Sequence, residues 1–187
     1  MFCSPNHHGA SGSVTNSNGI GARSIIINVD YRFPNRLPPS AQPKSLRLSM
    51  EVCSEAPLYH LDWLSDATVW INGVEVGTWT SPAGFGGEQG LLTPEWWTPR
   101  NTQYGLLKIW HVNGVEAEIG GMHISDVTVN DLHLHQASFI RVRIGMRSDA
   151  AHAGGLNLFG HKFGNYPQDI VLRMNYRMDD SLASFAP

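Results

Sequence analysis

Apolar and polar residues alternate along several stretches of the chain. The alternation is clearest over residues 25–31, 46–53, 140–146 and 170–176. Successive side chains of a β-strand point to opposite faces, so each stretch predicts a strand with one face in a core. No stretch shows a convincing apolar period of 3.6 residues, which a helix on a core would need. The pattern therefore predicts an all-β fold.

Two Asn-Gly pairs lie between β-type runs, at Asn72-Gly73 and Asn113-Gly114. This dipeptide suits a two-residue type I′ turn, because both central residues need a positive φ. The first turn would place Trp79 on the same face as Trp70. The cross-strand pairs predicted from the two turns are Ile71 with Val74, Trp70 with Glu75, Val69 with Val76, Val112 with Val115, and Trp110 with Ala117.

The chain of 187 residues contains 19 Gly and 11 Pro, which suits many turns between short strands. Roughly eight strands with long connections predict an antiparallel two-sheet sandwich of the jelly-roll type. We expect one such domain over residues 24–178, with a flexible N-terminal tail at 1–23 and a C-terminal tail at 179–187. Long loops on a rigid sandwich are where binding is usually found. The long loops predicted here are 54–66, 80–104 and 147–168.

Charge and cysteine content narrow the class of protein. The formal net charge is −3, so no basic surface is indicated, and we expect no nucleic-acid binding by this chain alone. No stretch approaches the ~18 apolar residues of a membrane span. Cys3 and Cys53 cannot form a disulfide framework, and the first residues lack the apolar core of a signal peptide. These features favour reduced thiols and a cytoplasmic location.

Aromatic residues in the loops indicate a ligand site. Sugars bind by stacking on an aromatic ring while carboxylates and amides accept hydrogen bonds from their hydroxyls. The tryptophans in predicted strands, Trp70, Trp79 and Trp110, are more often core residues, whereas loop tryptophans have nearly even odds of binding. The candidate ligand-binding residues are Trp63, Trp96, Trp97, Gln103, Tyr104, Asn157, His161 and Asn165.

Carboxylates in the same region raise the alternative of glycoside hydrolysis. That chemistry needs a general acid and a nucleophile or base separated by roughly 5–5.5 Å or 6.5–9.5 Å. Glu51 and Glu55 would lie about 13 Å apart on one strand at ~3.3 Å per residue, so they are not expected to be partners. Either would need a carboxylate from elsewhere in the fold. The candidate catalytic residues are Glu51, Glu55, Asp62, Asp66 and Glu75.

Metal and cofactor signals are weak. Asp131, His133 and His135 alternate onto one face of an expected strand, where imidazoles at i and i+2 can share a metal. Exposed strand histidines are more common, so no metal site is predicted. A structural Ca²⁺ ion would suit Asp-containing loops, but no spacing demands it. The glycine-rich run 154–166 has no phosphate-loop signature, and no cofactor is expected.

Several segments resemble a known family. Val69–Gly77 resembles the hairpin of galactose-binding-like jelly rolls, which include the sugar-binding domains of many glycosidases. A longer likeness, over about residues 25–176, is to the C-terminal domain of a group of ArsR-type winged-helix transcriptional regulators. It is carried by Glu51–Pro57, Asp62–Asp66, Gly77–Ser81, Thr93–Trp97, Thr102–Leu106 and Phe159–Asp169.

The resemblance implies a module that senses a small molecule, a sugar or glycoside, and that is joined in those relatives to a DNA-binding domain. Residues 1–23 cannot form a helix-turn-helix, so DNA binding is not carried over, and no catalytic residues come with the likeness. Three hypotheses follow: a small-ligand binding module, which is favoured, a small glycoside hydrolase, and a structural or dimerisation module. The sequence contains no element that indicates an oligomeric state.

Overall fold

The computed structural model describes residues 13–16, 27–56 and 58–178. These residues form eleven β-strands and no helix. The strands are β1 (Ser13–Asn16), β2 (Ile27–Pro34), β3 (Ala41–Ser54), β4 (Ser65–Ile71), β5 (Val74–Ser81), β6 (Leu106–Val112), β7 (Ala117–Ile119), β8 (Met122–Ser125), β9 (Phe139–Gly145), β10 (Leu156–Phe159) and β11 (Val171–Met178).

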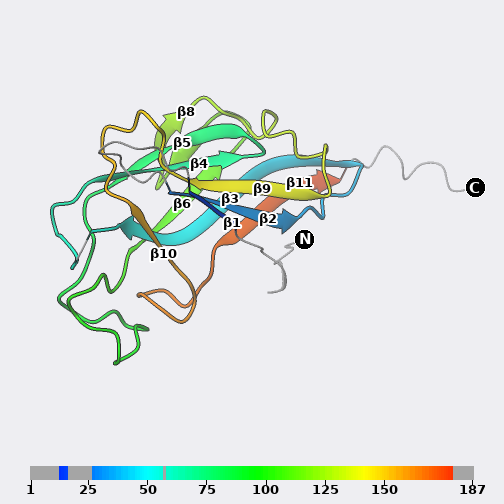
Figure 1. The fold of residues 1–187 in the computed structure, drawn as a ribbon. Coiled ribbons are helices and arrows are strands. Elements are labelled where there is room, and N and C mark those ends of the chain that lie inside the picture. Colours follow the sequence, from blue (N-terminus) through cyan, green and yellow to red (C-terminus); the bar gives the residue numbers. More distant parts are fainter. Residues whose placement is uncertain (1–12, 17–26, 57, 179–187) are drawn as a thin grey trace, which may run out of the picture.

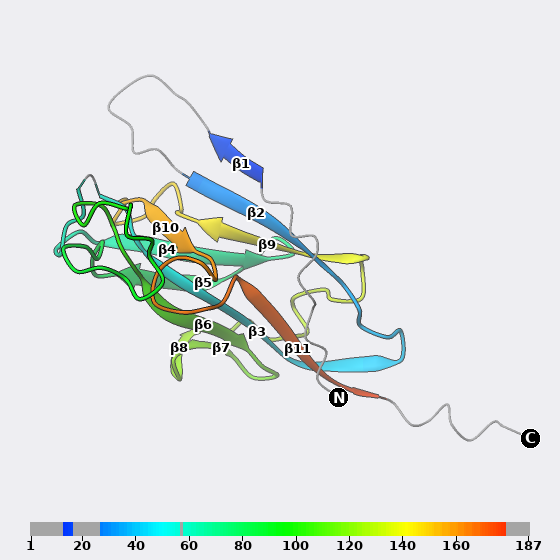
Figure 2. The same cartoon turned by 90° about the horizontal axis from the view of Figure 1, so that it is seen from below.

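The strands form two antiparallel sheets. The first has the order β1-β2-β9-β4-β5, and the second has the order β10-β3-β6-β7-β8. Strand β11 also pairs with β3, along Ala41–Ser49, while β10 pairs with the last residues of β3. The chain passes from one sheet to the other after β2, β3, β5, β8 and β9 (Figures 1 and 2). The predicted all-β, two-sheet architecture is confirmed.

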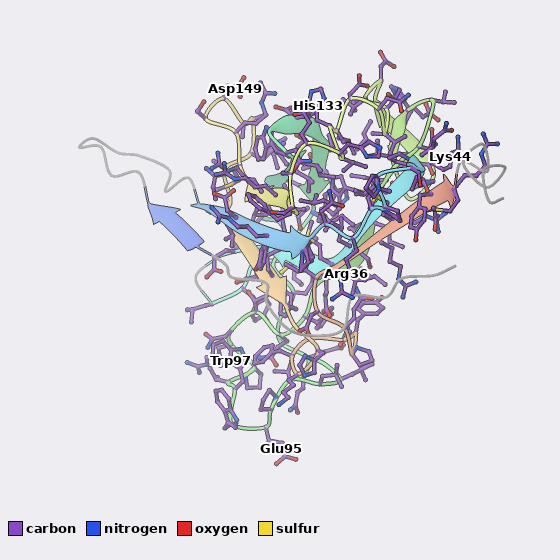
Figure 3. All side chains as sticks on the ribbon, turned by 90° about the vertical axis from the view of Figure 1, so that its right-hand side faces the viewer. Arg36, Lys44, Glu95, Trp97, His133 and Asp149 are labelled. Atoms are coloured by element: carbon purple, nitrogen blue, oxygen red, sulfur yellow. The ribbon has the colours of Figure 1, made fainter. Side chains whose placement is uncertain are left out.

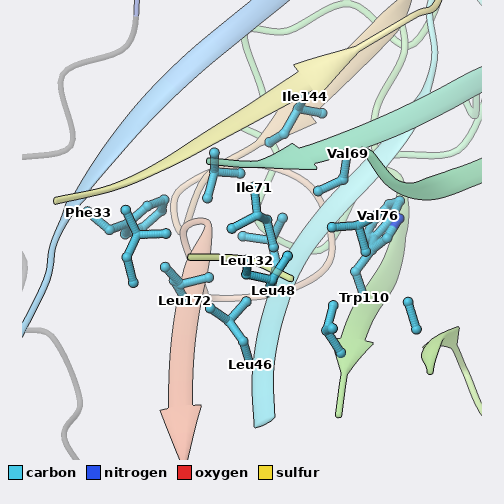
Figure 4. Close-up of a cluster of buried hydrophobic side chains, with 14 of the residues drawn as sticks. Phe33, Leu46, Leu48, Val69, Ile71, Val76, Trp110, Leu132, Ile144 and Leu172 are labelled. Carbon is cyan, nitrogen blue, oxygen red and sulfur yellow. The ribbon is translucent and has the colours of Figure 1, made fainter. Parts of the chain in front are cut away.

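The core lies between the two sheets (Figure 4). Most of its described side chains come from the inner faces of strands β2 to β11, where the alternation in the sequence places apolar residues. Leu46 and Leu48 on β3 are fully buried, as are Val69 on β4 and Val142 on β9. Trp110 is the largest fully buried side chain, which confirms it as a core residue.

The β4–β5 hairpin contains the predicted turn but not the whole predicted register. Asn72 and Gly73 have φ values of 50° and 89°, and Ile71 pairs with Val74 as expected. Val69 pairs with Gly77 rather than Val76, because the register shifts at a β-bulge. Beyond the bulge Ala67 pairs with Trp79, which packs against the core. The expected pair of Val69 with Val76, and the expected position of Trp79 on the outer face with Trp70, are therefore wrong.

The second Asn-Gly pair does not form a two-residue turn. Val112 pairs with Ala117, and Trp110 pairs with Ile119, so the connection spans residues 113–116. The Asn113 side chain accepts hydrogen bonds from the backbone N–H groups of Val115 and Glu116 (2.7 and 3.0 Å). An asparagine side chain that holds the turn in this way makes positive φ at both positions unnecessary. The pairs predicted for this hairpin, Val112 with Val115 and Trp110 with Ala117, are wrong.

Two further expectations concern segments outside the regular sheets. Residues 13–16, which fall in the expected N-terminal tail, form β1 and pair with β2. The rest of the tails at 1–23 and 179–187 lies outside the described residues. Asp131, His133 and His135 lie in turns, not on a strand, and His133 has a φ of 50°. The apolar alternation there comes from Leu132 and Leu134, which point into the core from an irregular segment.

Four long connections meet at one end of the molecule and form what we call the loop lobe. It comprises residues 55–64, apart from the undescribed residue 57, together with 82–105, 160–170 and the last residues, 152–155, of the connection after β9. Figure 3 shows Trp97 and Glu95 within it, beyond the end of the sheets. Backbone hydrogen bonds join its segments, from Glu55 N to Gly154 O (3.2 Å), Gly84 N to His60 O (2.9 Å) and Leu92 N to Gly164 O (2.8 Å).

Candidate functional site

A cleft of about 450 Å³ opens in the loop lobe. Its walls come from three parts of the chain: the segment after β3, residues 97–102, and β10 with the turn that follows it. Two long loops and the end of the second sheet therefore enclose one hollow. The described residues that line it are Glu55, Ala56, Leu58, Trp97, Asn101, Thr102, Asn157, Leu158, Phe159, Gly160 and Phe163.

Strand β10 fixes one wall of the cleft. It pairs with the last residues of β3, so that Asn157 lies opposite Cys53. The Asn157 amide nitrogen donates to the carbonyl oxygen of Ser54 (3.4 Å), which leaves its amide oxygen as an acceptor. Cys53 is fully buried, and burial raises the pKa of its thiol to about 12. Cys53 is therefore a core residue and not a nucleophile at neutral pH.

Aromatic rings form a second wall. The Trp97 indole N–H donates to the carbonyl oxygen of Thr102 (3.0 Å), which fixes the orientation of the ring. The rings of Trp97 and Phe163 are nearly perpendicular, at 85°, with centroids 5.4 Å apart. Phe159 stacks on Phe163 with centroids 6.2 Å apart and is almost completely buried. Trp97 and Phe163 remain partly accessible and form two adjoining faces of the cleft.

Glu55 is the carboxylate that lines the cleft. Its backbone N–H donates to Gly154 O, which holds the residue at the junction of two loops. Its carboxylate has no hydrogen bond or ion pair with any residue in the described part of the chain. Partial burial raises the pKa of this carboxyl above its ordinary value.

Glu51, the first of the catalytic candidates, is buried beneath the loop lobe. Only 1% of its surface is exposed. One carboxylate oxygen accepts from Gly105 N (2.7 Å), and the two oxygens together accept from Asn165 N (2.9 and 3.1 Å) and Tyr166 N (3.0 Å). Gly164, with a φ of 86°, lets the loop backbone approach the carboxylate this closely. Glu51 thus ties β3, the start of β6 and the 160–170 loop together.

The other three catalytic candidates lie elsewhere. Asp66 is on the outer face of β4, where burial opposes ionisation but hydrogen bonds from Thr80 and His152 outweigh it and lower the pKa of the carboxyl. Glu75 forms an exposed ion pair with Arg147 (2.6 Å). Asp62 is exposed in the loop before β4. Of the five candidate carboxylates, the structure brings only Glu55 to the cleft.

The ligand-binding candidates divide into those that line the cleft and those that build the lobe. Trp97 and Asn157 line it. Gln103 is fully buried, and its amide nitrogen donates to the carbonyl oxygens of Thr98 (2.7 Å) and Asn101 (3.2 Å). It therefore shapes the segment that carries Trp97.

The remaining candidates contact other parts of the lobe. The Trp63 indole N–H donates to Gly154 O (2.9 Å), and Tyr104 stacks on Phe85 at 5.3 Å. The Asn165 side chain accepts from Leu91 N (2.9 Å). His161 bonds with Asp169 (2.9 Å), and Trp96, which is 76% exposed, packs edge-on against Trp97.

Sequence reasoning missed several lining residues. Asn101, Thr102, Phe159 and Phe163 reach the cleft although none was singled out as a ligand-binding candidate. The signal that could have found the two phenylalanines is their place in the glycine-rich run 154–166. The neighbours of Trp97 at 101 and 102 carried no distinctive pattern.

Metal, membrane and family comparisons add little. The described residues contain no group of three or more His, Cys, Asp or Glu side chains placed to hold a metal ion. They also contain no helix with the length and apolarity to cross a membrane. No protein-family model matches the chain, and no curated protein matches it significantly. The function is therefore inferred from the cleft.

Proposed function

We propose that this chain is a small-ligand binding module and that a sugar-like ligand binds in the cleft of the loop lobe. The observation that carries the proposal is the composition of that one hollow. The aromatic residues Trp97 and Phe163 line it together with the polar residues Glu55, Asn157 and Asn101. A ring face for C–H groups, together with carboxylate and amide partners for hydroxyls, is the combination that sugars require.

The fold supports a finer proposal, that the domain is a jelly roll of the galactose-binding-like kind. Its chain crosses repeatedly between the two sheets, as strands of a jelly roll do, and does not complete one sheet before starting the other. The likeness of Glu51–Pro57 and Phe159–Asp169 to ArsR-type regulators fits the same idea. Both segments contribute to the cleft or to its support, as expected for a sensing domain.

The alternative of glycoside hydrolysis receives less support. Retaining and inverting glycosidases alike need two carboxylates on opposite sides of the scissile bond. Among the described lining residues Glu55 is the only carboxylate, and Glu51, Asp66 and Glu75 are engaged by other groups. Binding needs no second carboxylate, so the geometry favours a binder.

Thermal unfolding with a panel of mono- and disaccharides tests the proposal. A ligand at 100 Kd should raise the stability by ~2.7 kcal/mol, visible as a higher Tm. Trp97→Ala and Asn157→Ala should abolish the shift. Leu91→Ala, at an 83% exposed position outside the cleft, should leave the shift intact.

Two results would count against a sugar binder. One is the absence of a shift with every sugar of the panel. The other is a shift that survives both cleft substitutions, since the ligand would then sit elsewhere. Turnover of aryl glycosides that is lost in Glu55→Gln would instead establish the hydrolase.

A further inference from the structure

We infer that the ligand of the cleft carries a positively charged ammonium group. This inference rests on the proposed function and specifies the ligand class: an amino sugar or a small quaternary ammonium compound. Three features of the cleft support it, namely its charge, the state of its carboxylate and the arrangement of its rings.

The charge carried by the described lining residues of the cleft is negative. Glu55 is the only charged residue among the described residues of the wall, which include no Lys, Arg or His. An anionic ligand would face this carboxylate with no compensating cation. A neutral ligand would offer this carboxylate hydrogen bonds alone, whereas a cation would add an ion pair.

The exposed Glu55 carboxylate differs from the buried carboxylates of the chain. Asp30 is paired with Arg141 and Arg143, and Glu51 accepts three backbone N–H groups. Glu55 is exposed and has no comparable partner in the described residues. Its carboxylate can therefore pair with a bound cation without losing another partner.

The rings supply the second recognition element for a cation. Trp97 and Phe163 both line the cleft and meet at 85° in an edge-to-face contact, so two aromatic rings border one space. The face of an aromatic ring attracts an ammonium group within ≈ 6 Å of its centroid, and such cages recognise quaternary ammonium ligands. The chain uses this contact internally, since Lys108 Nζ lies 4.8 Å from the centroid of the Trp79 ring.

The size of the hollow agrees with such a ligand. A volume of about 450 Å³ falls within the ≈ 300–1,000 Å³ of pockets for small organic ligands. It accommodates a monosaccharide or a smaller ammonium compound. Asn157 and Asn101 then provide hydrogen bonds to hydroxyl groups beside the charge.

Calorimetric titration with matched pairs of ligands tests the inference. Glucosamine is compared with N-acetylglucosamine and glucose, and choline is compared with its uncharged isostere 3,3-dimethylbutan-1-ol. At about pH 6.5, below the ordinary pKa of an α-amino group, glucosamine is protonated. We expect the charged member of at least one pair to bind at least tenfold more tightly than its neutral counterpart.

Three variants, one of them a control, locate the preference. Glu55→Gln should remove it, lowering the affinity for the charged ligand about tenfold and leaving the neutral ligand unchanged. Asp62→Asn makes the same change of charge at an exposed site outside the cleft and should have no effect. Trp97→Leu should weaken charged and neutral ligands together. Circular dichroism and Tm measurements confirm that each variant is folded.

The outcomes separate the inference from the proposed function. Equal or tighter binding of neutral sugars would overturn the inference and leave the sugar-binding proposal standing. A cation preference for choline alone, lost in Glu55→Gln, would support the inference and overturn the sugar class. A preference that persists in Glu55→Gln would overturn the assignment of the charge to this cleft.

Discussion

The sandwich core and the loop lobe are stabilised by different forces. In the core, aliphatic side chains such as Leu46, Leu48 and Met50 are fully buried between two regular sheets. In the lobe, the fully buried Gln103 side chain donates hydrogen bonds to loop carbonyl groups. Beneath the lobe, the almost fully buried Glu51 carboxylate accepts hydrogen bonds from loop N–H groups. Apolar burial has no preferred direction, whereas these hydrogen bonds fix particular atoms in place.

The difference shows how a rigid binding site can be built without regular structure. Loop backbone that is withdrawn from water must have its N–H and C=O groups satisfied, and no sheet ladder is available in the lobe. Backbone groups of neighbouring loops supply some of these partners, and the side chains of Glu51 on β3 and Gln103 within the lobe supply others. The shape of the cleft therefore depends on a few polar side chains, while the stability of the domain depends on many apolar ones.

The largest loss of stability is expected for a substitution in the core. Trp110→Ala should destabilise the protein by about 3–5 kcal/mol, because it removes the largest buried side chain and leaves a cavity between the sheets. Urea unfolding followed by circular dichroism measures the change. Trp96→Ala removes the same kind of side chain from a 76% exposed position of the lobe and should cost within about 0.5 kcal/mol. Similar costs for the two variants would refute the distinction between core and lobe.

A smaller loss of stability is expected when the Glu51 hydrogen bonds that hold the lobe on the sandwich are weakened. Glu51→Gln replaces a charged acceptor of three backbone N–H groups and should cost about 1.5–3 kcal/mol. Amide hydrogen exchange should accelerate at Gly105, Asn165 and Tyr166, while exchange in the middle of β3 remains slow. Asp62→Asn is the control with the same charge change. Unchanged exchange at the three amides would show that Glu51 does not hold the lobe.

The smallest effect concerns a polar contact on the outer face of the sandwich. Hydrogen bonds from Arg143, and then Arg141, lower the pKa of Asp30 from 3.8 to about 2, although burial opposes this. A lowered folded-state pKa stabilises the protein above about pH 4, and this contribution is lost as the pH falls toward 2. We expect about 1–2 kcal/mol, less than the full shift would give, because both arginines are partly exposed.

Urea unfolding between about pH 6 and pH 2.5 measures that contribution. The difference in stability between the wild type and Asp30→Asn should shrink over this range. A difference that stays constant with pH would mean that the ionised carboxylate of Asp30 does not stabilise the folded state.

Local patterns predicted the strands better than their pairing. The alternation over 46–53 and 140–146 was informative because one face of each strand is buried against the opposite sheet. The bulge showed in the sequence only as Gly77 within a β-type run, which does not fix the pairing of the two strands. It depends on neighbours distant in sequence, since Gly77 O accepts from the Trp110 indole and a side chain at position 77 would collide with Ile124.

Only part of the candidate site could be predicted, again because local patterns do not reveal contacts between residues distant in sequence. Trp97, Asn157 and Glu55 were identified by residue type, and all three line the cleft. The environment of Glu51 could not be predicted, because its partners lie 54, 114 and 115 residues further along the chain. Residue type indicates what a side chain can do, while long-range packing decides whether it faces ligand or backbone.

The bulge in the β4–β5 hairpin also bears on how this protein can change in length. In a regular strand, deleting one residue turns every following side chain to the opposite face. Val76 and Gly77 both lie opposite Val69, so loss of Gly77 would restore a regular ladder in which Thr78 still faces outward and Trp79 still faces inward. Gly77 is therefore a position at which a deletion can be accommodated during evolution without inverting the sheet around it.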